Sequence, residues 1–98
     1  MNEILKPFRE KIDALDDDLV DLLIQREKII LEVAAIKNEK NIPAVLQDRV
    51  DEVRNRCETR AKEQGMSGDY VREIYRKIIR ESCDLEESIL NPTQDNAA

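Results

Sequence analysis

The sequence contains no histidine and no tryptophan, and its only aromatic residues are two tyrosines and one phenylalanine. Without histidine, most zinc sites and the Ser-His and Cys-His forms of nucleophilic catalysis are excluded. So few aromatic rings also argue against cages for cationic ligands and against stacking platforms for nucleic-acid bases. We therefore expect no metal and no cofactor.

Cysteines and long apolar runs are equally scarce. Cys57 and Cys83 are too few for a disulfide scaffold, and we interpret both as small core residues. No apolar run approaches the roughly 18 residues that a helix needs to span a bilayer. Residues 1–4 lack the basic and then apolar order of a signal peptide. The sequence thus predicts a cytoplasmic protein.

The charge is predominantly negative, with 22 acidic against 16 basic residues and a formal net charge of −6. A nucleic-acid-binding protein would instead present a basic face. An excess of acidic residues also disfavours adhesion to an anionic membrane. We expect neither nucleic acid nor a membrane as a partner.

Three helices are predicted, over residues 7–40, 47–64 and 68–90, and no segment shows the alternation of a strand. Pro7 is tolerated in a first helical turn, and Pro43 lies just beyond the first helix. Gly65 suits a left-handed cap after the second helix, and Ser67 suits the N-cap of the third. The pattern predicts one all-α domain over residues 1–90, followed by a disordered tail at 91–98.

The first helix is too long for a compact monomer. About 33 residues with a rise of 1.5 Å each give ~50 Å, about twice the diameter of a compact chain of this length. Its apolar residues recur at steps of three and four over the whole length: Phe8, Ile12, Leu15, Leu19, Leu22, Leu23, Ile29, Ile30, Val33 and Ile36. Two shorter helices cannot cover both ends of this apolar stripe, so we predict an obligate homodimer, either with exchanged helices or as a plain coiled coil.

Two cations interrupt the apolar stripe. Arg26 and Lys37 are eleven residues apart. At ~100° and 1.5 Å per residue, they share one face of the helix and lie ~16 Å apart. Because a buried cation without a partner is costly, this placement indicates either structural ion pairs or an anion site. Arg9 lies ~25 Å before Arg26, so it can share a small ligand with it only from a second, antiparallel chain.

The two shorter helices also carry polar residues next to their apolar faces. Arg49 lies beside Val50 on the second helix, and Ser82 and Glu86 are one turn apart on the third. Each also has an ordinary interpretation. The hydroxyl could bond back to its own helix, and each charge could simply be solvated.

These residues resemble the pattern of the all-α chorismate mutases over roughly residues 5 to 90. The most specific stretch is FREKIDALD at positions 8–16, where the family opens with Leu-Arg-x-x-Ile-Asp-x-Leu-Asp. The matching positions that follow are Leu22, Leu23, Arg26, Lys37, Pro43, Arg49, the segment IIRES at 78–82, and Glu86. The resemblance implies an intertwined homodimeric six-helix bundle with two active sites and no cofactor.

The resemblance also implies which residues bind the carboxylates of the substrate. Arg9 of the partner subunit and Arg26 would hold the two carboxylates. Arg49 would bind the enol-pyruvyl carboxylate, and Ser82 would also bind a substrate carboxylate. Arginine suits this role because its planar guanidinium matches a carboxylate.

Two further residues would meet the ether oxygen whose bond breaks. Lys37 would contact a carboxylate and this oxygen. Glu86 replaces a glutamine common in bacterial members and needs a proton to donate to the oxygen. The implied reaction, the [3,3] rearrangement of chorismate to prephenate, needs no nucleophile. It requires a folded substrate conformer and positive charge at the ether oxygen.

Two positions depart from the family pattern. Members usually carry an acid three residues after the proline and another just after the second-helix arginine, and both help to bind the ring hydroxyl. Here the substrate-facing positions are Leu46 and Val50, and Asp48 could compensate through a register shift. The 4-amino-4-deoxychorismate mutases have a similar Arg-Val step and a Cys-x-x-Glu like that from Cys83 to Glu86. Isochorismate pyruvate lyases also have Arg-Val, so three substrates stay open.

A non-enzymatic helical dimerisation or regulatory module is a separate interpretation. Such a module needs no buried cations, so replacing Arg26 or Lys37 with alanine would stabilise it or have little effect. The sequence is also compatible with a segment of a longer bifunctional enzyme and with a laboratory-made family member.

Overall fold

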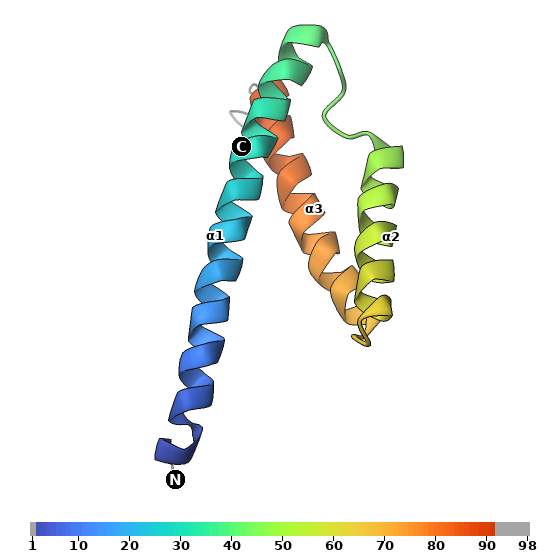
Figure 1. The fold of residues 1–98 in the computed structure, drawn as a ribbon. Coiled ribbons are helices and arrows are strands. Elements are labelled where there is room, and N and C mark those ends of the chain that lie inside the picture. The colour runs from blue at the N-terminus through green and yellow to red at the C-terminus, as the bar shows by residue number, and fades with distance from the viewer. Residues whose placement is uncertain (1, 92–98) are drawn as a thin grey trace.

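The computed structural model describes residues 2–91, and over that range the chain consists of three helices (Figure 1). These are α1 (Asn2–Lys40), α2 (Gln47–Glu63) and α3 (Gly68–Leu90). No strand occurs among the described residues, which confirms the all-α prediction. The predicted disordered tail falls, apart from Asn91, outside the described residues.

The helix α1 begins earlier than the sequence predicts. It starts at Asn2, so Pro7 lies inside the helix rather than at its beginning. At that place proline removes one hydrogen bond, to the carbonyl of Glu3, near an end where several N–H groups are unpaired anyway. Ile4 and Leu5 continue the apolar stripe to this end. The prediction of a start near Pro7 was therefore wrong, and α1 contains 39 residues.

Asn41 ends α1 two residues before Pro43. Its φ of +58° is left-handed, and the N–H of Ile42 donates to the carbonyl of Lys37 at 2.9 Å. This is the Schellman arrangement, in which a left-handed residue lets the chain satisfy a free helix carbonyl. Asparagine adopts this conformation more readily than most residues. The loop that follows, residues 41–46, leads to α2.

The turn between α2 and α3 contains both of the capping residues that the sequence predicts. Gly65 has φ +81°, and the N–H of Met66 donates to the carbonyl of Ala61 at 2.9 Å. The side chain of Ser67 accepts a hydrogen bond from the N–H of Tyr70 at 3.3 Å. Both predicted caps are confirmed, and α2 ends one residue earlier than predicted. The short turn makes α2 and α3 an antiparallel pair.

The helix α3 packs against both other helices, whereas α1 and α2 do not pack against each other in the described part of the chain (Figure 1). The buried residues of the core include two small ones, Ala34 on α1 and Ala61 on α2. Ile79 on α3 is also buried. Because α1 and α2 each pack only against α3, their side chains can line a common space next to α3.

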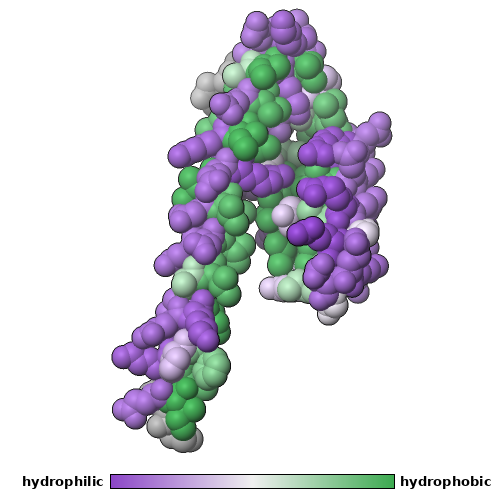
Figure 2. Space-filling view, in the orientation of Figure 1, coloured by the Kyte–Doolittle hydropathy of each residue, from purple (hydrophilic) through white to green (hydrophobic). Residues whose placement is uncertain are grey.

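The N-terminal half of α1 extends beyond the other helices and carries an exposed apolar stripe (Figures 1 and 2). Ile4, Phe8 and Leu15 are 70%, 59% and 64% exposed. The radius of gyration is 17.4 Å, against ~13 Å for a compact chain of this length. Within residues 2–91, nothing covers this part of the stripe. None of the helices in residues 2–91 is long and apolar enough to cross a membrane.

Candidate active site between the three helices

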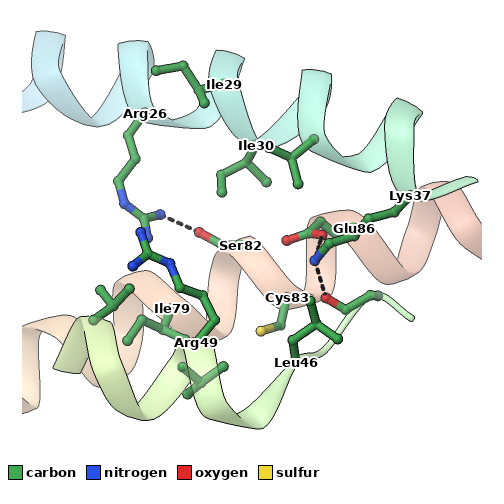
Figure 3. Close-up of a pocket in the computed structure, with 14 residues that line it drawn as sticks. Arg26, Ile29, Ile30, Lys37, Leu46, Arg49, Ile79, Ser82, Cys83 and Glu86 are labelled. Atoms are coloured by element: carbon green, nitrogen blue, oxygen red, sulfur yellow. Dashed lines mark hydrogen bonds and ion pairs between the residues drawn. The ribbon is translucent and has the colours of Figure 1, made fainter. Parts of the chain in front are cut away.

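A cavity of about 290 Å³ lies where the three helices converge (Figure 3). Every helix and the loop between α1 and α2 contribute to its wall. The lining residues are Arg26, Ile29, Ile30, Val33, Lys37, Ala44, Leu46, Arg49, Val50, Val53, Ile79, Ser82, Cys83 and Glu86. All of the predicted site residues except Arg9 are among them.

The period of α1 brings Arg26 and Lys37 to the same cavity. Their separation of eleven residues is close to three full helical turns, so both side chains leave α1 toward α3. Ile30 and Val33 lie between them on the same wall. The cavity thus has a cation at each end of an apolar segment of α1.

Lys37 is held by two acceptors. Its Nζ lies 2.6 Å from Oε1 of Glu86, and both side chains are buried, with 13% and 6% of their surface exposed. The same ammonium donates to the backbone carbonyl of Ala44 at 2.8 Å. An ammonium has three protons, so at least one remains for a ligand. The contact with Glu86 is an ion pair without hydrogen-bond alignment, so Oε1 keeps its capacity to accept a hydrogen bond.

Arg26 contacts a neutral group instead of a carboxylate. Its guanidinium donates to the hydroxyl of Ser82 across the gap between α1 and α3 (Figure 3). Among the described residues it forms no ion pair. A half-buried guanidinium without a counterion favours binding of an anion.

Arg49 enters the cavity from the first turn of α2. It forms an ion pair with Glu52 on the same helix, and the two side chains are 63% and 64% exposed. Exposed pairs of this kind contribute ~1 kcal/mol at most. The guanidinium of Arg49 can therefore exchange Glu52 for a ligand carboxylate at little cost.

The wall nearest α2 is apolar. Leu46 and Val50 line it, and the neighbouring Asp48 does not. Cys83 lies in the same wall, and burial, together with the nearby charge of Glu86, raises the pKa of its thiol. Both cysteines are half-buried, so the interpretation as core residues was too strong. A neutral thiol and two aliphatic side chains offer no charge to a polar substituent of a ligand.

Arg9 is the predicted residue that the chain does not bring to the cavity. It lies on the exposed N-terminal half of α1, beside Lys6 and Asp13. Sequence reasoning also missed two members of the site. The carbonyl of Ala44 has no sequence signature, whereas Cys83 stands next to Ser82 and one turn before Glu86.

The geometry of the cavity is better suited to binding a small dicarboxylate than to covalent catalysis. Three cations face one cavity, one of them has no counterion within residues 2–91, and apolar side chains line the wall between them. A model of the chorismate mutase type II family matches residues 8–87. The chain belongs to the chorismate mutase type II family. The matched segment of this chorismate mutase domain includes Arg9 and every residue of the cavity.

Individual relatives in the family are distant. The chain is 28% identical over 95 residues to a chorismate mutase of Methanocaldococcus jannaschii, covering 97% of this chain and 96% of that protein. It is 28% identical over 87 residues to a 4-amino-4-deoxychorismate mutase of Streptomyces venezuelae, covering 89% and 84%. It is 29% identical over 80 residues to the T-protein of Haemophilus influenzae, but spans only 21% of that relative's length.

Proposed function

We propose that this chain is a chorismate mutase, an isomerase that converts chorismate to prephenate by a [3,3] rearrangement. The observation that carries the proposal is the placement of Arg26, Lys37 and Arg49 around one cavity with an apolar interior. The reaction needs a flexible dicarboxylate held in a folded conformer. Two guanidinium groups and an ammonium at different sides of one cavity can impose that conformer.

The charges of the cavity also suit the transition state. The ether oxygen gains negative charge as its bond breaks, and a positioned donor stabilises that charge. Lys37 is the candidate, because Glu86 and Ala44 fix its ammonium while leaving one proton free. Glu86 can add a second donor to the oxygen only when it is protonated.

We further propose that a second copy of the chain covers the exposed stripe of α1. The accessible surface is 8003 Å² for a mass of 11.4 kDa, whereas a compact monomer of this mass exposes ~5,800 Å². The excess is larger than the ~800 Å² per partner that a standard interface buries. An intertwined six-helix dimer would bury this excess and complete the core.

The same assembly would complete the site. Arg9 lies ~25 Å along α1 from Arg26, too far to meet a ligand bound there. In an antiparallel pair of α1 helices, Arg9 of the partner subunit would reach the cavity. It would add a third guanidinium to those of Arg26 and Arg49, and Ser82 would bind from α3.

The apolar wall favours a second candidate substrate, 4-amino-4-deoxychorismate. Leu46 and Val50 offer no charged partner to a ring hydroxyl, and one relative is a 4-amino-4-deoxychorismate mutase. Chorismate remains the first candidate because a relative that aligns over 96% of its length is a chorismate mutase. Cleavage of isochorismate to pyruvate is the third possibility.

The deciding experiment is incubation of the protein separately with chorismate, 4-amino-4-deoxychorismate and isochorismate, with identification of the products. We expect prephenate from the first substrate at a rate far above the uncatalysed one. Lys37→Ala should abolish it, and Lys28→Ala, on an exposed face of α1, should not. Turnover of none of the three substrates would leave the helical dimerisation module as the surviving interpretation.

A further inference from the structure

Arg49 lines the cavity, but the carboxylate that it contacts does not. Its Nη1 donates to Oε1 of Glu52, one turn further along α2, and Glu52 is not part of the cavity wall. Lys37, by contrast, pairs with Glu86 inside the wall. The ion pair of Arg49 therefore holds its guanidinium between the cavity and the solvent (Figure 3).

Glu52 lies where it opposes a ligand at Arg49. In the free protein its negative charge already offsets that of the guanidinium. A ligand carboxylate that binds the same guanidinium comes close to Glu52, and like charges repel each other. The ligand therefore gains the full attraction of Arg49 only after Glu52 has moved away.

Glu52 has a second cation within reach on the other side. Arg56 lies four residues further along α2, and a glutamate four residues before a cation is the favourable order for an ion pair on a helix. Arg56 is exposed and forms no ion pair within residues 2–91. The neighbouring Asp51 already pairs with Arg54, at 3.1 Å. Glu52 can therefore leave Arg49 without remaining unpaired.

The other charges around Arg49 favour this exchange. Arg26 and Lys37 face the same cavity, and Glu86 offsets the charge of Lys37. An anion that enters the cavity is thus attracted by two guanidinium groups. Asp48 lies four residues before Glu52 on α2, and like charges at this spacing repel each other. This repulsion acts on Glu52 in the direction of Arg56.

We propose that Glu52 is an internal competitor of the substrate, which pairs with Arg49 in the free protein and moves to Arg56 when a substrate carboxylate binds. This role rests on the proposed function, because it assigns a substrate carboxylate to Arg49. Glu52 acts through Arg49 and does not touch the substrate. It weakens binding, because the substrate must break the pair, and it offsets the charge of Arg49 while the cavity is empty.

Replacement of Glu52 tests the competition. Glu52→Gln should lower KM for chorismate about two- to fivefold, the range that an exposed ion pair contributes. The value of kcat should change little, because saturating substrate has already displaced Glu52. Asp48→Asn is the matched control, since it removes the same charge from the same helix and leaves the pair with Arg49 intact. A KM that does not fall in Glu52→Gln, or that falls equally in Asp48→Asn, would overturn the proposal.

Replacement of Arg56 tests the second partner. In Arg56→Ala the displaced Glu52 has no cation to move to, so KM should rise by about twofold. In a Glu52→Gln background the same replacement should have no effect, because the two residues act as one unit. Arg60→Ala is the control, since Arg60 is also exposed but lies two turns from Glu52. An effect of Arg56→Ala that persists without Glu52 would contradict the exchange.

A measurement without turnover keeps this proposal separate from the proposed function. Phenylglyoxal modifies a guanidinium more slowly when a carboxylate covers it, and mass spectrometry of peptides reports each arginine separately. Glu52→Gln should raise the rate at Arg49 severalfold. Arg76 is the internal reference, because it keeps its exposed pair with Glu73. If no substrate is converted, the proposed function fails, and the rate at Arg49 then decides alone. An unchanged rate would refute the competition.

Discussion

Lys37 and Glu86 form a buried ion pair between α1 and α3, with 2.6 Å between Nζ and Oε1. When ionised, Glu86 can act only as an acceptor. The pair holds the ammonium in place, but the same charge opposes the negative charge that would develop on the ether oxygen. Protonation of Glu86 would turn the opposing group into a donor.

The first prediction follows from this conflict. With chorismate, kcat should fall as the pH rises, because only a protonated Glu86 can donate to the ether oxygen. Glu86→Gln should flatten the profile and keep activity at neutral pH, because an amide donates at any pH. The measurement is kcat against pH for both proteins where each stays folded. Parallel profiles would exclude Glu86 as a donor to the ether oxygen.

The second prediction concerns Arg9, which lies on the exposed half of α1 and away from the cavity of its own chain. Arg9→Ala and Arg26→Ala should each be inactive as homodimers. After exchange of subunits, a mixed dimer has one site with both lesions and one with neither, so about half of the wild-type activity per mixed dimer should return. Mass spectrometry verifies the exchange. If mixed dimers form without activity, the two arginines do not share a site.

The third prediction concerns the apolar wall. Leu46→Asp combined with Val50→Glu should raise kcat/KM for chorismate relative to 4-amino-4-deoxychorismate by about tenfold or more, because the ring hydroxyl gains a charged hydrogen-bond partner. Competition between the two substrates in one reaction measures this ratio directly. The control is Val53→Glu, which adds an acid elsewhere in the same cavity. An unchanged ratio would show that these positions do not contact the ring substituent.

The fourth prediction concerns assembly. Because Ile4, Phe8 and Leu15 are exposed in the single chain, the protein should be a homodimer at micromolar concentration, without a stable folded monomer. Sedimentation equilibrium measures the mass and circular dichroism the helix content. Phe8→Glu together with Leu15→Glu should dissociate and unfold it. A monomer that keeps its full helix content would contradict the dimer.

The fifth prediction concerns the link between α2 and α3. A hydrogen bond from Arg72, and a second from Lys62, hold the pKa of Glu58 below its ordinary value. A depressed pKa stabilises the fold above the unfolded pKa, and this contribution is lost as the pH falls through the folded pKa. Glu58→Gln should therefore lower the free energy of unfolding at neutral pH, with the difference closing in acid.

The check for this fifth prediction is urea denaturation of both proteins at a fixed concentration over a series of pH values. Glu73→Gln is the control, because Glu73 pairs with Arg76 within α3, and their side chains are 65% and 64% exposed. Exposed pairs contribute little at any pH. If the difference in the free energy of unfolding between the wild type and Glu58→Gln stays constant down to acid pH, the protonation of Glu58 does not affect stability.

Much of the fold could be predicted because its signals are local. Gly65 and Ser67 cap helices through their own backbone and side chain, and the period of α1 places Arg26 and Lys37 on one face. The start of α1 could not be predicted in the same way. A proline in an early turn is compatible both with a first turn and with an interior position, and Pro7 occupies the latter.

The charged residues of the site could be predicted from the sequence, but the contacts that they form could not. The carbonyl of Ala44 reaches Lys37 only because the loop after α1 folds back, and every residue has such a carbonyl. The hydrogen bond from Arg26 to Ser82 depends on how α1 and α3 cross. These contacts join separate elements, so no short stretch of sequence encodes them.

If a second chain covers the exposed stripe of α1, as we propose, the stripe would also affect the kinetics of folding. The α2–α3 pair is joined by a short turn, so its contacts are local and can form quickly. Phe8 and Leu15 are exposed even with all three helices in place. In the proposed homodimer their burial would be a bimolecular event, and its rate would rise with protein concentration. The last step of folding would then be an encounter in solution, and dilution would slow it.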